Sequence, residues 1–141
     1  MLTILLIIMR HIIYIIIGVI VLAFVSCRKT ADINPNDVAA QAARTYYDYL
    51  LRGKYEAYVD GFYRPDSIPS SYREQLIVSA KQYVGQMRDD HKGLKSIEAA
   101  TAKTDTAKHL GEAYLVLVFG DKTKEEIVVP LVLHNGSWML R

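Results

Sequence analysis

Tyrosine is concentrated in one short stretch of this 141-residue chain. Six of its ten tyrosines fall between positions 46 and 63. Such a cluster can form an aromatic pocket whose hydroxyl groups bind a ligand, or it can pack in the core with the hydroxyls reaching water. Both interpretations remain open from the sequence. The aromatic residues that we expect to face inward and to line a pocket are Tyr46, Tyr49, Tyr83, Tyr114 and Trp138.

Acid–base chemistry in such a pocket would need a carboxylate or a histidine beside a hydrogen-bond donor. Asp48 and Asp60 fall on predicted helices and could face a pocket, whereas His109 and His134 fall at the ends of predicted strands. Residues of these types mostly lie at the solvated surface of a protein. We therefore assign no catalytic residue from the sequence.

Other kinds of site find no support in the pattern of residues. The sequence has no Gly-x-Ser-x-Gly nucleophile motif and no phosphate-binding glycine-rich loop. Its histidines are isolated from other potential ligands, so neither a metal nor a cofactor is expected. The 17 Lys and Arg are interspersed with 15 Asp and Glu, which predicts no nucleic-acid partner. The acidic pairs Asp89-Asp90 and Glu125-Glu126 adjoin Lys or Arg and predict ordinary solvated charge.

The chain begins with a long apolar run that Arg10 interrupts. An arginine deep in a bilayer is disfavoured by about 2.5–3.5 kcal/mol, which argues against a membrane span. If translation begins at Met9, a short basic segment precedes the apolar stretch 12–25. That stretch has the length of a signal-peptide core and falls short of the roughly 17–25 residues that a spanning helix needs. We therefore expect a signal peptide over residues 1–27.

The apolar run ends in Phe24-Val25-Ser26-Cys27, which resembles the lipobox of bacterial lipoproteins. The resemblance implies that a diacylglyceryl group is attached to the Cys27 sulfur and that the chain is cleaved before Cys27. Several acyl chains anchor a protein stably, since each buried methylene contributes about 0.8 kcal/mol. The protein would then be anchored in the bacterial cell envelope, at the outer membrane facing the periplasm. The alternative is that Cys27 is an ordinary apolar helix residue.

A short tether over residues 28–35 and two helices follow the leader. Asn34 and Pro35 are typical of a helix start, and an apolar stripe with a repeat of three to four residues continues towards Gly53, where the helix should end. A second, shorter helix is predicted over residues 55–62, before a loop rich in proline.

A third helix is predicted to open with a capping box formed by Ser71 and Glu74. Gly93 should close it. Its apolar stripe, with spacings of three or four residues, consists of Tyr72, Leu76, Ala80, Tyr83 and Met87.

After Gly93 the apolar pattern changes to the alternation of β-strands. Short links predict antiparallel neighbours, and Asn135-Gly136 predicts a tight hairpin turn with positive φ at both residues. Pro130 cannot donate a hydrogen bond to a neighbouring strand, so we expect a bulge or an edge-facing position there. The predicted strands cover residues 94–106, 112–119, 126–133 and 137–141.

The order of these elements over residues 36–141 resembles the NTF2-like (cystatin-like) fold, in particular the small envelope lipoproteins of the DUF4878 type. The resemblance rests on residues 46–57 and on the closing stretch 135–140, where Trp138 follows the Asn-Gly turn. It implies an α+β cone in which three N-terminal helices pack on a curved four-stranded antiparallel sheet.

The mouth of such a cone can hold a small apolar ligand, so the resemblance implies a non-catalytic domain that binds a small molecule or a protein partner. The alternative that it leaves open is an enzyme of the isomerase or dehydratase type, with Asp48 or Asp60 as base and a tyrosine as electrophile. A cone that holds a buried carboxylate would favour the enzyme. Whether the domain forms a homodimer also stays open.

Overall fold

The computed structural model describes residues 1–23 and 33–141. The chain divides into one unit that ends at Asp32 and a second unit, Ile33–Arg141. The first contains a single helix, α1 (Leu2–Ala23). None of the helices within these described residues is sufficiently long and apolar to cross a membrane. The predicted lipidation site Cys27, and all but the last residues of the predicted tether, lie outside the described residues.

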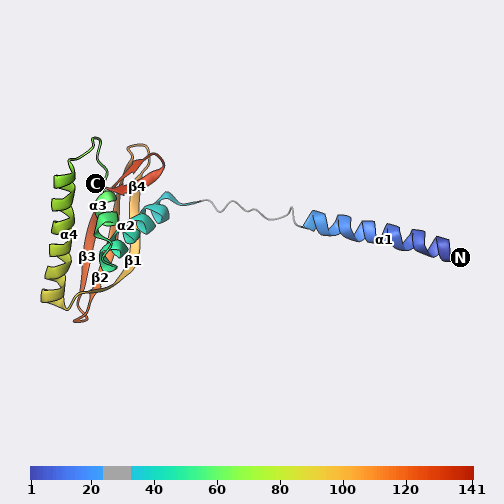
Figure 1. Cartoon of the computed structure of the whole chain (residues 1–141), viewed down its shortest axis with the longest axis horizontal. Coiled ribbons are helices and arrows are strands. Elements are labelled where there is room, and N and C mark those ends of the chain that lie inside the picture. Colours follow the sequence, from blue (N-terminus) through green and yellow to red (C-terminus); the bar gives the residue numbers. More distant parts are fainter. Residues whose placement is uncertain (24–32) are drawn as a thin grey trace. The chain divides into compact units, whose positions relative to one another are not determined.

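The second unit packs helices on a curved antiparallel sheet, as Figure 1 shows. The sheet has four strands in the order β1-β2-β3-β4, each beside its neighbour in sequence. This arrangement confirms the predicted meander, and each observed strand begins and ends within two residues of its predicted bounds. The strands are β1 (Leu94–Asp105), β2 (Leu110–Phe119), β3 (Lys124–His134) and β4 (Ser137–Leu140).

The helix α2 (Pro35–Leu51) begins and ends as the sequence predicts. The Asn34 side chain accepts a hydrogen bond from the backbone N–H of Asn36 at 3.0 Å, and Gly53 follows the helix with a φ of +69°. The buried face of α2 contains small residues, which allow its backbone to lie close to the sheet. These are Ala39, Ala40 and Ala43.

The helix α3 (Tyr55–Asp60) is short and ends at Gly61. The chain then runs beside β4: the Leu140 N–H donates to the Gly61 carbonyl at 2.9 Å, and the Tyr63 N–H donates to the Leu140 carbonyl at 2.7 Å. Phe62 and Leu140 thereby form a parallel bridge. These bonds cover the outer edge of β4 and fix the loop that follows α3.

The helix α4 (Ser70–His91) differs from its prediction in two respects. The predicted capping box is wrong, because the chain enters the helix from Pro69 and Ser71 already lies inside the first turn. The predicted stripe is only partly buried. Ala80 and Met87 lie in the core, whereas Tyr72 and Tyr83 are exposed, since α4 is packed over a narrower face than the stripe would cover.

The inner face of the sheet supplies most of the core, and the strands alternate as expected between buried and exposed residues. The Asn135-Gly136 turn has φ values of +48° and +76°, as a type I′ turn requires, and is confirmed. Pro130 pairs with Glu112 without a bulge. Its carbonyl accepts from the Arg141 N–H, so the N–H that proline lacks would have pointed to the same side, away from β2. The largest fully buried side chains are Leu50, Leu115, Leu117, Leu131 and Leu140.

Candidate functional site

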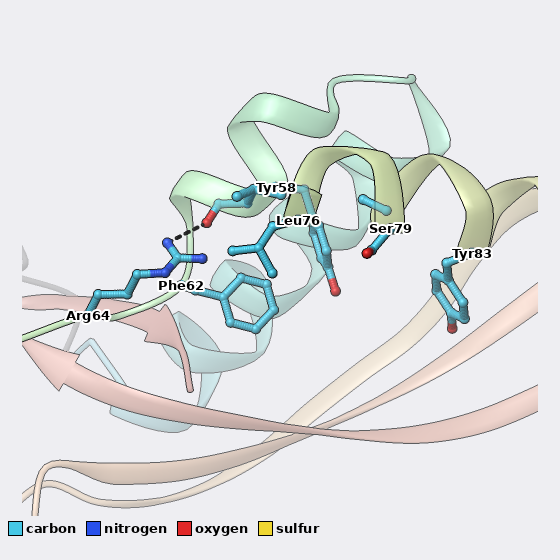
Figure 2. Close-up of a pocket in the computed structure, with 8 residues that line it drawn as sticks. Tyr58, Phe62, Arg64, Leu76, Ser79 and Tyr83 are labelled. Atoms are coloured by element: carbon cyan, nitrogen blue, oxygen red, sulfur yellow. Dashed lines mark hydrogen bonds between the residues drawn. The ribbon is translucent and has the colours of Figure 1, made fainter. Parts of the chain in front are cut away.

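A hollow of about 250 Å³ opens between α3, α4 and the loop after α3, as Figure 2 shows. We call it the α3–α4 hollow. Its volume is slightly below the roughly 300–1,000 Å³ of a site for a drug-sized ligand. Most of its surface is apolar, with a guanidinium group and three hydroxyl groups at its rim. The residues that line it are Tyr58, Val59, Phe62, Arg64, Leu76, Ser79, Ala80 and Tyr83.

Aromatic packing holds one wall of the hollow in place. The Tyr58 ring meets the Phe62 ring edge to face, with centroids 5.4 Å apart, and the Tyr47 ring in the same manner at 5.9 Å. Edge-to-face contacts of this kind favour one orientation of each ring. The wall is therefore formed by side chains that are fixed before any ligand arrives.

Arg64 stands at one end of the hollow and is half-buried. One Nη1–H donates to the Val59 carbonyl at 2.9 Å, and the guanidinium carbon lies 5.8 Å from the centre of the Phe62 ring. Within residues 1–23 and 33–141, the ion pairs of the structure do not include Arg64. The neighbouring Asp60 carboxylate instead accepts two bonds from Arg73, at 2.8 and 2.7 Å.

The tyrosines around the hollow are neutral hydrogen-bonding groups. Tyr83 is 41% exposed, and its partial burial, with help from the nearby Tyr47 and the Glu125 charge, raises the pKa of its phenol to about 12. Burial also raises the pKa of Tyr58 and of Tyr47. At neutral pH these phenols therefore keep their protons, and Tyr58 and Tyr83, which line the hollow, can donate to a ligand.

A second, more polar hollow of about 190 Å³ lies on the other side of Tyr83. Asp90 of α4 and Glu125 of β3 line it. Glu125 pairs with the buried Leu117, so it occupies an inner-face position of the sheet. Asp90 and Glu125 are both exposed, which agrees with the solvated charge that the sequence predicts for the two acidic pairs. The two-residue alternation with Ile127 indicates the side of the sheet on which Glu125 lies.

No protein family model and no curated protein sequence matches the chain. A solved structure does match: a Campylobacter jejuni protein described as an NTF2-like transpeptidase, with a TM-score of 0.56 and 11% identity. The match covers 70% of this chain and 92% of that chain. The chain has an NTF2-like fold. At this level of identity the likeness shows the fold alone, so the function must be argued from the NTF2-like domain's own residues.

The NTF2-like domain does not bring the five predicted pocket aromatics together. Of these five, Tyr83 lines the α3–α4 hollow, while Tyr46 and Tyr49 line a separate, shallow groove along α2. Trp138 is buried in the core, and its carbonyl accepts a bond from the Tyr46 hydroxyl at 3.1 Å. The expectation that Tyr114 faces inward is wrong. It pairs with the exposed Val128 on the outer face, because the alternate residues of β2 occupy the inner positions.

The predicted acid–base candidates lie outside the α3–α4 hollow. Asp48 forms an ion pair with Arg52 at 2.6 Å, and Asp60 forms the pair with Arg73. His109 and His134 are exposed at strand ends. Among residues 1–23 and 33–141, apart from the side chains left undescribed, no charged or polar residue is buried. The buried carboxylate that would favour an enzyme is not found in the described part of the NTF2-like domain.

Sequence reasoning missed most of the residues that form the hollow. Phe62 was predicted as the last residue of the helix 55–62, whereas α3 ends at Asp60; Arg64 falls in the loop, and Ser79 lies on the polar side of the predicted α4 stripe. Of the lining residues, the sequence predicted Tyr83 as a pocket aromatic and Leu76 and Ala80 as part of an apolar helical stripe. No cluster of three or more potential metal ligands occurs in the described part of the chain.

Proposed function

We propose that the chain is a lipid-anchored protein of the bacterial cell envelope whose NTF2-like domain binds a small, mainly apolar molecule without changing it chemically. The observation that carries this proposal is the open, apolar α3–α4 hollow with a few polar groups at its rim. Small-molecule sites commonly combine an apolar lining with a small number of placed polar groups. The ion-paired state of Asp48 and Asp60 weighs against acid–base catalysis.

The size of the hollow limits the affinity that apolar contact can supply. A ligand that buries about 200 Å² of apolar surface gains about 5 kcal/mol before the cost of lost motion. Even without that cost, a gain of this size corresponds to a dissociation constant of only about 0.2 mM. Useful affinity therefore requires the polar groups of the rim as well as the apolar walls.

Membrane anchoring rests on the sequence Phe24-Val25-Ser26-Cys27. We expect the mature protein to begin at Cys27 with acyl chains on its sulfur. The Cys27→Ser variant should leave the membrane fraction or stay unprocessed, since no other cysteine can accept the lipid. Mass spectrometry of the membrane-extracted protein checks this, and an unmodified Cys27 or a retained leader would contradict it.

Ligand binding is tested by filling the hollow from its exposed rim. Ser79 is exposed and lines the hollow, so Ser79→Trp would place an indole in it at small cost in stability. The neighbouring Val78 is 51% exposed and does not line the hollow, so Val78→Trp is a matched control.

The full chain and both variants are purified from the same cells and extracted with organic solvent, and the extracts are compared by mass spectrometry. We expect a small molecule with the wild type and with Val78→Trp, and its loss with Ser79→Trp. The same extract from all three proteins would contradict the proposed site.

A further inference from the structure

We propose that the ligand of the α3–α4 hollow is a small amphipathic anion, with an apolar body between Phe62 and Leu76 and an acidic group bound to Arg64. The inference rests on the proposed function and names the class of molecule that the site selects. It follows from the hydrogen-bond donors of the Arg64 guanidinium that have no partner in the described chain.

Arg64 has hydrogen-bonding capacity that the described chain leaves unused. A guanidinium carries five N–H donors in a fixed fork, and the structure gives Arg64 one bond, to the Val59 carbonyl. It is half-buried beside Phe62 and forms no ion pair among the described residues; the nearby Asp60 carboxylate, which binds Arg73, acts on Arg64 only at longer range. Arg73 is the contrast, because both of its bonding nitrogens meet the Asp60 carboxylate.

Contacts with neighbouring elements hold the Arg64 guanidinium in place. The preceding residues Gly61 and Tyr63 are hydrogen-bonded to Leu140 of β4, and the Val59 carbonyl fixes one nitrogen. In Figure 2 the guanidinium lies beside Phe62 and Leu76, at the edge of the hollow. The remaining donors are therefore presented to the hollow before a ligand arrives, and a fork of this kind binds a carboxylate through two parallel bonds.

The charges around the hollow favour one orientation of such a ligand. Arg64 is a lining residue at one end, whereas Asp90 and Glu125 line the space beyond Tyr83 at the other. An anion is attracted to the first end and repelled from the second. Ser79 adds no competing donor, because its hydroxyl already donates to the Gln75 carbonyl at 3.0 Å. The acidic group of the ligand should therefore face Arg64, with an uncharged end towards Tyr83.

The test compares two probes of the same shape and different charge, 4-phenylbutyrate and its neutral amide. Each is titrated into the full chain in detergent by calorimetry. The Ser79→Trp variant, with the hollow filled, measures the heat of partition into the micelles. We expect the acid to bind the wild type about tenfold or more tightly than the amide, as charge-assisted hydrogen bonds typically give.

The variant Arg64→Gln retains a donor for the Val59 carbonyl and removes the charge. We expect it to lose the preference for the acid while its affinity for the amide stays unchanged. Equal binding of the two probes to the wild type would overturn the anion inference and leave the proposed function standing. If neither probe binds the wild type more tightly than it binds the Ser79→Trp variant, the proposed site is overturned, and the anion inference with it. The difference between the acid and the amide in binding to the wild type tests the anion inference even if Arg64→Gln folds poorly.

Discussion

The ring of Tyr46 lies directly over the Cα of Gly61, with no room for a side chain between them. The Tyr46 hydroxyl donates a hydrogen bond to the Trp138 carbonyl of β4. One side chain therefore joins α2, the end of α3 and the last strand. Gly61 is needed here for close approach and not for an unusual backbone angle, because it adopts a φ of −73°.

Gly61→Ala should destabilise the domain, because the added methyl group would overlap the Tyr46 ring. Overpacking of this kind typically costs about 1–3 kcal/mol. Urea unfolding measures the change. The control is Gly85→Ala inside α4, where only the end of the Arg88 side chain is near, and it should stabilise by up to about 1 kcal/mol. Equal stability of Gly61→Ala and wild type would contradict the close contact.

Gly136→Val should also destabilise the protein, for a different reason. Nothing lies within 4 Å of a Cβ at Gly136, so the cost comes only from its φ of +76°, which a β-branched residue rarely adopts. A left-handed backbone costs a residue with a side chain about 1–2 kcal/mol. Asparagine tolerates this conformation, so Gly136→Asn should recover most of the loss in thermal unfolding. Similar unfolding temperatures for the Gly136→Val and Gly136→Asn variants would argue against the type I′ turn.

Trp138→Ala should remove much of the stability of the domain, since the indole is 5% exposed and belongs to the main core. Truncation of a packed tryptophan typically costs about 3–5 kcal/mol. Because it is the only tryptophan, its emission in the native protein should be that of an indole shielded from water. Met139→Ala, on the opposite face of β4, should cost less. Emission typical of exposed indole would contradict the packing of β4.

The lowered pKa of Asp121, in the turn before β3, predicts that the domain loses stability in acid. The hydroxyl and backbone N–H of Thr123, followed by His91, lower the pKa of Asp121 from 3.8 to about 2. A carboxyl whose pKa is lower in the folded chain stabilises it above the unfolded value, and this contribution is lost as the pH falls from about 4 to about 2. Asp121→Asn should therefore be less stable than wild type at pH 5, and the difference should shrink towards pH 2. A difference that stays constant over this range would contradict the lowered pKa.

Local signals in the sequence predicted the elements of the domain well. Asn34 and Gly53 bound α2, and the Asn135-Gly136 turn sets the register of the last hairpin, because each of these depends only on a few adjacent residues. The capping box at Ser71 failed because the helix begins from Pro69, two residues earlier. Tyr83 was placed correctly on α4, but its partial exposure depends on how closely α4 approaches the sheet.

The candidate site could not be predicted in the same way. Arg64 meets Leu76 and Ser79 across the hollow only because Leu140 holds the intervening loop, and no periodic pattern connects these positions. Lipid attachment at Cys27 stays a prediction, since it concerns residues outside those that the structure describes.

The bridge between Phe62 and Leu140 also bears on the kinetics of folding. It joins a position near the start of the domain to one at its last strand, and contacts that close so long a stretch of chain are slow to form. The helices and the β1–β2–β3 hairpins can assemble from nearby residues first. The α3–α4 hollow should therefore be completed in the last phase of folding, and a refolding experiment should recover helical circular dichroism before it recovers probe binding.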